Sequence, residues 1–146
     1  MLAHIFTRAV HESACSHYTP DQLHAWAPGD VAGFVSRHRA YDAIIAEIDG
    51  EIAGFSDCRA DGYIDMLYVN PDFGRRGVAS ALLAHIEALA RPKGIDRLHV
   101  RASLTARPVF ERAGFCVVEP LIVELAGQRF QTFIMAKEVG FPRSRE

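Results

Sequence analysis

The stretch from Asn70 to Leu83, NPDFGRRGVASALL, decides the fold, because it predicts a turn followed by a helix with an unusual start. Arg75 and Arg76 stand in the first turn of that helix, between Gly74 and Gly77. A helix N-terminus favours acidic side chains by roughly 0.3–1 kcal/mol each, and a glycine inside a helix costs about 1 kcal/mol relative to alanine. Such a local conflict indicates a functional turn rather than a badly started helix.

A strand that runs into a glycine-rich turn and then into a helix can bind a phosphate. The first helical turn has backbone N–H groups without intrahelical partners, and the helix dipole favours an anion beside them. Glycine lets a phosphate approach the backbone, and arginine becomes favourable once a pyrophosphate is bound. A P-loop would need a lysine after Gly77 and a Rossmann fingerprint would need G-x-G-x-x-G, so neither common nucleotide motif fits.

Length and composition indicate one globular domain. The 146 residues are 49% hydrophobic and 23% charged, which suffices for one packed core. No apolar run approaches the ~20 residues of a membrane span, and the N-terminus lacks a signal-peptide layout. The three cysteines are far apart and match no zinc spacing. These features predict a cytoplasmic protein with no metal site and no membrane partner.

The charge is unevenly distributed along the chain. Residues 75–112 hold 8 basic and 3 acidic side chains, whereas residues 1–74 hold 4 basic and 11 acidic ones. A basic middle beside an acidic first half suggests an anionic ligand on one side and a cationic one on the other, although a scattered solvated surface would give the same counts. The net charge of −2 argues against a nucleic-acid partner. The basic side chains of the middle segment are explained by a bound phosphate instead.

Hydrophobic periodicity predicts helices first and strands after them. Thr19, Pro20 and Gln22 form a capping box with proline at the first helical position. Asp49-Gly50 indicates one hairpin turn, and Gly127 indicates another. The predicted elements are helices over 3–17, 19–28, from Asp30 onwards, 75–91 and within 104–115, and strands over 41–48, 51–60, 61–69, 97–102, 115–127 and 128–138.

The order of three elements sets the topology. A strand over 61–69, a helix over 75–91 and a strand over 97–102 require a right-handed crossover between parallel or neighbouring strands. The sequence therefore predicts one α/β domain over residues 1–140, followed by a loose tail over 141–146.

Two motifs resemble the Gcn5-related N-acetyltransferase (GNAT) family. YIDMLYVNPDFGRRGVASALL, residues 63–83, is similar to its acetyl-CoA-binding core, and LTARPVFERAGF, residues 104–115, is similar to the following helix, which usually reads A-x-x-x-Y-E-x-x-G-F. The resemblance covers about residues 40–137, with both motifs in the right order. It implies an α/β fold with a single mixed, mostly antiparallel sheet flanked by helices, here without the family's first strand.

The resemblance implies acetyl-CoA as co-substrate and no metal. Backbone amides in the turn would hold the pyrophosphate, and the preceding strand would present backbone groups to the pantetheine where it splays from the next strand. The implied cofactor-binding residues are Leu67, Tyr68, Val69, Arg75, Arg76, Gly77, Val78, Ala79, Ser80, Ala106, Phe110 and Arg112.

Several positions depart from the family pattern. Gly74 occupies the usual Gln/Arg position, with the cation next to it at Arg75. Phe110 replaces a tyrosine that often protonates the departing thiolate, and phenylalanine has no proton to donate. Ser103 stands where an Asn often contacts pantetheine. The chain begins inside the family's first helix, which would leave a sheet edge uncovered and is compatible with a homodimer.

The implied reaction moves an acetyl group to a primary amine of a small molecule or peptide. The amine must lose a proton, since a free alkyl amine has a pKa near 10. Asp65, two residues before Leu67, is the candidate base, either directly or through water. Candidates for the acid that protonates the thiolate are Tyr63 and Tyr68, which are near in the sequence, and Ser103 or water. Strand alternation puts Tyr63, Asp65 and Leu67 on one face and Tyr68 on the other.

The acceptor pocket is expected in the first half of the chain. His17, Tyr18 and Trp26 form an aromatic and polar cluster suited to a cationic or flat amine. The competing interpretation is that these aromatic side chains simply cover the core. Two other functions stay open at this point, namely a non-catalytic acyl-CoA-binding module and a nucleotide-binding regulatory domain.

Overall fold

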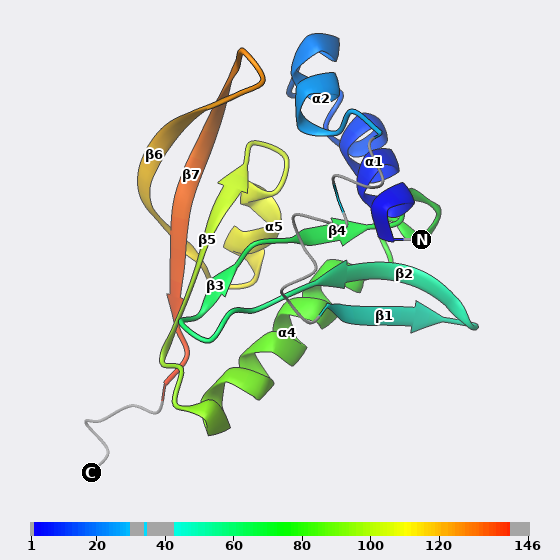
Figure 1. Ribbon diagram of the computed structural model, residues 1–146. Helices are drawn as coiled ribbons and strands as arrows, with labels where there is room; N and C mark the ends of the chain where they lie inside the picture. Colours follow the sequence, from blue (N-terminus) through cyan, green and yellow to red (C-terminus); the bar gives the residue numbers. More distant parts are fainter. Residues whose placement is uncertain (1, 30–33, 35–42, 141–146) are drawn as a thin grey trace.

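The computed structural model describes residues 2–29, 34 and 43–140 (Figure 1). The helix predicted from Asp30 and the tail 141–146 lie outside this part of the chain. The helices are α1 (Leu2–Ser13), α2 (Pro20–Trp26), α4 (Val78–Ala90) and α5 (Arg107–Arg112). The strands are β1 (Ile44–Ile48), β2 (Glu51–Ser56), β3 (Tyr63–Ile64), β4 (Leu67–Val69), β5 (Arg97–Ser103), β6 (Cys116–Leu125) and β7 (Gln128–Glu138).

The strands form a mixed α/β arrangement in which hydrogen bonding divides the expected single sheet into two. One sheet has the order β1-β2-β4 and is antiparallel throughout. The other has the order β3-β5-β7-β6, with β3 parallel to β5 and the remaining pairs antiparallel. The parallel β3–β5 pairing confirms the predicted crossover through α4.

The boundary between the two sheets falls inside the strand predicted over 61–69. That strand is two short ones, because the chain leaves β5 after Ile64 and joins β2 at Leu67. Asp65 and Met66 connect them. This break separates β4 from β5, as Figure 1 shows in the diverging directions of the two strands.

Helix α4 starts later than predicted. It runs over Val78–Ala90, with Gly77 at the N-cap in the left-handed conformation (φ +76°). Arg75 also has a positive φ, of +61°, so both arginines belong to the loop before the helix. The prediction that the helix starts at residue 75 was wrong, because Gly77 reverses the chain direction and sets the helix start at Val78.

The helices cover the sheets through apolar faces. Helix α4 buries Leu82, Leu83 and Ile86 and packs on β1, β2 and β4. Helix α1 buries Ile5 and Phe6 among others and packs on β4. The predicted capping box of α2 is confirmed, with Thr19 and Gln22 bonded reciprocally.

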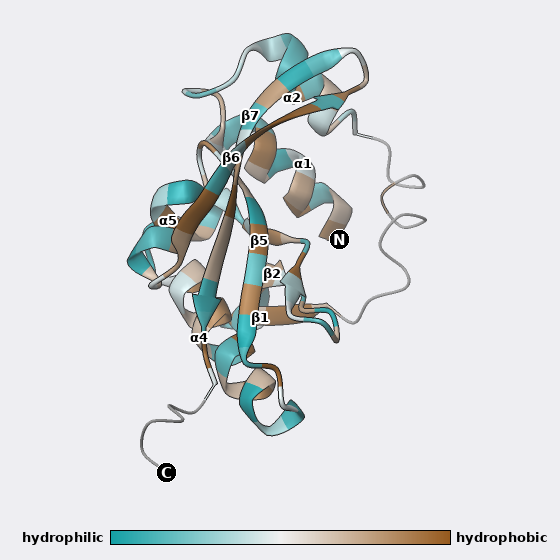
Figure 2. Cartoon of the chain, turned by 90° about the vertical axis from the view of Figure 1, so that its left-hand side faces the viewer, coloured by the Kyte–Doolittle hydropathy of each residue, from teal (hydrophilic) through white to brown (hydrophobic). Residues whose placement is uncertain are grey.

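Strand β6 lies at the outer edge of the four-stranded sheet (Figure 2). Both predicted hairpins are confirmed, and their turns place Gly50 and Gly127 at positive φ. Edge strand β6 carries the exposed apolar side chains Val118, Leu121, Ile122 and Leu125. In the part of the chain that the structure describes, no helix has the length and apolar character needed to cross a membrane.

Candidate functional site

A cleft of about 330 Å³ opens where β4 and β5 separate. Strand β4 is paired with β2 and strand β5 with β3 and β7, so no ladder joins the two strands across the opening. Leu67, Tyr68 and Val69 form one wall and residues 100–103 form the other. Its remaining lining includes Ala9, Val10, Ser13, Ala14, Tyr18, Trp26, Tyr63, Asp65, Ala79, Thr105, Ala106, Val109, Phe110, Val123, Leu125, Phe130 and Thr132.

One end of the cleft reaches the first turn of α4 at Ala79. This turn has no side-chain cap and no acidic residue, so its backbone N–H groups are available to an external acceptor. A Cβ added at Gly77, the N-cap of α4, would meet no atom within 4 Å apart from its chain neighbours, so the space beside this residue is open. Exposed Arg75 and Arg76 flank this space, with the Arg76 guanidinium 5.5 Å from the Phe73 ring centroid. These features fit a pyrophosphate.

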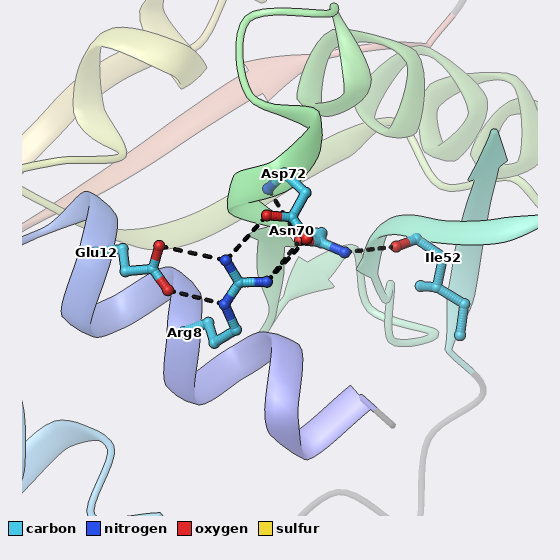
Figure 3. Close-up of polar contacts among 5 residues, drawn as sticks. All are labelled: Arg8, Glu12, Ile52, Asn70 and Asp72. Atoms are coloured by element: carbon cyan, nitrogen blue, oxygen red, sulfur yellow. Dashed lines mark hydrogen bonds and ion pairs between the residues drawn. The ribbon is translucent and has the colours of Figure 1, made fainter.

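A polar network connects α1 to the turn before this loop (Figure 3). The Arg8 guanidinium donates to Glu12 at 2.8 Å and to both carboxylate oxygens of Asp72 at 3.0 and 3.1 Å. Asn70 accepts from the Asp72 backbone N–H at 3.0 Å and donates to the Ile52 carbonyl at 3.1 Å. The network therefore fixes the turn over Pro71–Phe73 against both α1 and β2.

This network predicts a pH-dependent contribution to stability. The hydrogen bond from Arg8 lowers the pKa of Asp72 below its ordinary value of 3.8. A carboxyl whose pKa is lower in the folded state stabilises the fold above its unfolded pKa, and loses that contribution as the pH falls through the folded pKa. Asp72→Asn is expected to lower Tm at pH 7, with the difference from wild type shrinking below pH 3.8.

The measurement is thermal unfolding of both proteins from pH 7 down to about pH 3. Arg8→Gln serves as the matched control, because it removes the partner of the same ion pair and should give the same pH dependence. A Tm difference that stays constant over this range would show that the ion pair is not its source.

Asp65 faces the cleft from the connection between β3 and β4. Its carboxylate lies 3.7 Å from the Arg59 guanidinium, which also lies 5.0 Å from the centroid of the Tyr63 ring. Burial raises the pKa of the Tyr63 phenol, so Tyr63 retains its proton at neutral pH. The cleft thus holds a carboxylate and a protonated phenol, the two groups expected from the sequence.

The predicted placement of Leu67 and Tyr68 on opposite faces of the strand is confirmed. Leu67 packs with core residues of α4, whereas the Tyr68 ring packs against Phe6 of α1 and against Phe55, with ring centroids 4.8 and 5.7 Å apart. Both residues line the cleft together with Tyr63 and Asp65, so Tyr68 adds a further hydroxyl-bearing side chain to it. Its apolar surroundings raise its pKa, and a hydrogen bond from Trp26 opposes this shift.

The residues predicted around α5 separate into two groups. Ser103 and Ala106 line the cleft, where the Ser103 hydroxyl accepts from the Ala106 backbone N–H at 3.0 Å. Phe110 also lines it but is only 1% exposed, with its ring 5.1 Å from that of Phe115. Arg112 is exposed on the helix surface and does not line the cleft.

The residues predicted for the turn separate in the same way. Ala79 lines the cleft. Arg75, Arg76, Gly77 and Ser80 are exposed outside it, and Val78 is buried in the core. The structure therefore divides this motif between the space over the helix start and the cleft beside it.

The predicted acceptor residues are only partly brought together. Tyr18 and Trp26 line the cleft with ring centroids 5.8 Å apart, and Phe130 completes an aromatic group with them. The Tyr18 hydroxyl donates to the Gln131 carbonyl at 2.7 Å and accepts from the Leu104 N–H at 2.9 Å, so this residue offers its ring rather than its hydroxyl. His17 lies outside the lining, with Nδ1 2.9 Å from the Thr105 hydroxyl.

Sequence reasoning missed two groups of residues. The first group is apolar and comes from α1 and the second hairpin, for example Val10 and Val123. The sequence predicted these segments as a helix and strands, but not that they line the cleft. Ser56 and Asp57 were also missed, although both are completely buried behind Asp65 and bond to its connection. A charged residue directly after an apolar strand run was the available signal.

Comparisons with known proteins agree with this arrangement. The model of the acetyltransferase (GNAT) domain family matches residues 15–137. The chain is 42% identical to YafP of Escherichia coli K12, described as an uncharacterized N-acetyltransferase, over 134 residues that cover 92% of this chain and 85% of that protein.

Solved structures are similar too. A GCN5-related N-acetyltransferase from Rhodopseudomonas palustris superposes with a TM-score of 0.88 at 31% identity, covering 94% of this chain and 87% of that one. The PaiA N-acetyltransferase from Thermoplasma acidophilum, in complex with coenzyme A, superposes with a TM-score of 0.67 at 16% identity, covering 94% and 90%.

Proposed function

The chain belongs to the GNAT acetyltransferase family, and on that premise we propose that it transfers an acetyl group from acetyl-CoA to a primary amine of a small molecule or peptide. The observation that carries the proposal is one continuous cleft. It reaches the uncapped start of α4 at Ala79 and contains the carboxylate of Asp65. An anion site and a proton acceptor in the same cleft are what an acyl-CoA donor and an amine acceptor need.

Acetyl-CoA supplies an activated acetyl thioester and a thiolate leaving group. We propose that the amides of Val78, Ala79 and Ser80, with Arg75 and Arg76 beside them, hold its pyrophosphate. Backbone groups of Leu67 and Val69 then have open hydrogen-bonding positions toward β5 for the pantetheine, because β4 has no ladder on that side.

Asp65 is proposed to accept the amine proton, directly or through one water, as the amine nitrogen attacks the acetyl carbon. Arg59 lies beside the carboxylate and fixes its orientation. The proton needed by the thiolate then comes from Tyr63, Tyr68, Ser103 or water. Phe110 is excluded as its source, because a phenyl ring has no exchangeable proton. Of the side chains, Tyr63 is connected to Asp65 through Arg59, whose guanidinium lies 5.0 Å from the Tyr63 ring centroid and 3.7 Å from the Asp65 carboxylate.

The acceptor end of the cleft is assigned to the aromatic group of Tyr18, Trp26 and Phe130. These rings lie on α2, the preceding turn and β7, and all three line the cleft. A ring-lined wall favours a flat or apolar substituent on the amine, with the ammonium form attracted toward the aromatic faces.

Trp26→Ala is accordingly expected to raise KM for the amine by about tenfold, because it removes one aromatic wall. Affinity for coenzyme A is expected to stay within about twofold, since Trp26 lies on α2 and not on the backbone of β4 or α4 that is proposed to hold the cofactor. Steady-state kinetics and calorimetric titration with coenzyme A measure the two effects. Trp26→Phe is the matched control and should retain most of the affinity for the amine; equal losses for amine and coenzyme A would contradict the assignment.

Release of free thiol from acetyl-CoA over a panel of amines tests the function itself. Small aliphatic, aromatic and peptide amines are compared, and the acetylated product is identified by mass. Tight binding of coenzyme A without turnover on any amine would favour the non-catalytic acyl-CoA-binding module. Absence of coenzyme A binding would reject both functions.

The organisation around this site is proposed as follows. Residues 1–140 form the catalytic domain and residues 141–146 a tail outside it. The reaction is placed in the cytoplasm, and the apolar edge of β6 is the surface at which a homodimer would form. Gel filtration with light scattering measures the oligomeric state.

A further inference from the structure

The backbone N–H groups of Asp65 and Met66 donate hydrogen bonds to a side chain rather than to a neighbouring strand. They lie between Ile64, the last residue paired with β5, and Leu67, the first paired with β2. Oδ1 of Asp57 accepts from the backbone N–H of Asp65 at 2.8 Å and of Met66 at 2.9 Å. The Ser56 hydroxyl donates to the Met66 carbonyl.

We propose that Ser56 and Asp57 form a buried clamp that positions Asp65 in the cleft. By replacing the missing ladder, the clamp holds the chain where it crosses from one sheet to the other, and so directs the Asp65 side chain toward the opening between β4 and β5. Both residues are positioning residues, since neither lines the cleft. The kinetic part of this inference rests on the proposed function of Asp65.

The burial of Asp57 is unfavourable for folding, which indicates that its two hydrogen bonds serve a function. Ser56 and Asp57 are both 0% exposed. Among the described residues, Oδ2 of Asp57 has no hydrogen-bond partner, and burial raises the pKa of this carboxyl. A buried carboxylate with an unsatisfied oxygen is costly, and such groups in folded proteins call for an explanation.

Strand β4 has its own support, which limits what the clamp does. Its residues pair with β2 through Val69–Gly54, Tyr68–Phe55 and Leu67–Ser56. The clamp therefore serves the two connecting residues rather than the whole strand. Its loss should disturb Asp65 while leaving the backbone groups of β4, and hence the donor site, in place.

Asp57→Leu removes the acceptor with little change in volume, and Asp57→Asn keeps an acceptor oxygen at the same position. We expect Asp57→Leu to lower kcat by about tenfold or more, because a displaced catalytic group loses its alignment. Asp57→Asn should recover most of that loss, and both variants should bind coenzyme A within about twofold of wild type. Provided that Asp65→Asn lowers kcat, unchanged kcat in Asp57→Leu, or equal losses in both variants, would overturn the clamp.

A double-mutant cycle tests whether Asp57 acts through Asp65. If it does, Asp57→Leu combined with Asp65→Asn should have the same kcat as Asp65→Asn alone, because the clamp has nothing left to position. Losses that multiply in the double variant would show independent effects and would reject the positioning role.

Amide exchange separates failure of the clamp from failure of the proposed function. In wild type, the N–H groups of Asp65 and Met66 should exchange slowly, and Asp57→Leu should accelerate these two amides by at least about tenfold while those of β4 stay protected. If Asp65→Asn retains full activity, Asp65 is not the base. The exchange rates of the two amides then test on their own whether Asp57 holds the connection. Two amides that remain protected in Asp57→Leu would overturn it.

Discussion

Asp65→Asn is expected to lower kcat by about 10²- to 10⁴-fold, the range that general acid–base catalysis contributes. Asparagine keeps the size and the hydrogen-bonding shape of the side chain but does not accept the amine proton. Because Asp65 lines the cleft from the connection between β3 and β4, the change removes a base without altering a strand. Affinity for coenzyme A should be unchanged within about twofold.

The measurement is thiol release under saturating acetyl-CoA and amine, across a range of pH. Asp21→Asn is the control, an exposed aspartate on α2 outside the cleft lining, and should retain wild-type kcat. In the variant, activity should recover at alkaline pH, where a larger fraction of the amine is already neutral. Full activity of Asp65→Asn at neutral pH would remove Asp65 from the mechanism.

Gly77→Leu is expected to weaken coenzyme A binding by about tenfold or more, because its side chain would fill the space over the start of α4. Apart from its neighbours in the chain, no atom lies within 4 Å of the position that the Cβ would take, so the new side chain starts in open space. Its cost to stability is the left-handed backbone, about 1–2 kcal/mol for a residue with a Cβ.

Gly94→Leu separates the two effects. Gly94 has nearly the same conformation, with φ +76° and ψ +12° against φ +76° and ψ +16° for Gly77, and equally open surroundings. Both variants should therefore lose similar stability in thermal unfolding. Calorimetric titration should show weaker coenzyme A binding in Gly77→Leu alone. Equal affinities in the two variants would contradict the anion site at α4.

Local sequence signals predicted the parts of the site that depend on a few adjacent residues. The conflict of Arg75, Arg76 and Gly77 with an ordinary helix start marked the turn, and the structure has an uncapped helix there. The correction was small: the arginines precede the helix, because Gly77 adopts a positive φ. Hairpins at Gly50 and Gly127 followed from turn chemistry for the same reason.

Features that depend on distant pairing could not be predicted from local signals. The strand over 61–69 reads as continuous, but Ile64 pairs with Val100 and Leu67 pairs with Ser56. This change of partner opens the cleft between β4 and β5, which Leu67 and Tyr68 both line although they pack on opposite faces of β4. It also leaves the backbone N–H groups of Asp65 and Met66 to bond with the Asp57 side chain, eight and nine residues earlier in the chain.

The acceptor side shows the same limit. Trp26 and Tyr18 were predicted to lie in the pocket because of their residue type, whereas Phe130 joins them from β7 through the fold. His17 was grouped with them by proximity in the sequence, but it points to Thr105 instead. Adjacency in the chain does not determine which face of a turn a side chain takes.

A crystal structure of the protein with coenzyme A tests the central claim most directly, namely that the opening between β4 and β5 is the acetyl-donor site. The account predicts the pyrophosphate against the amides of Val78, Ala79 and Ser80, the pantetheine along β4, and the thiol in the same cleft as Asp65. Coenzyme A bound elsewhere, with the cleft and the start of α4 empty, would contradict it.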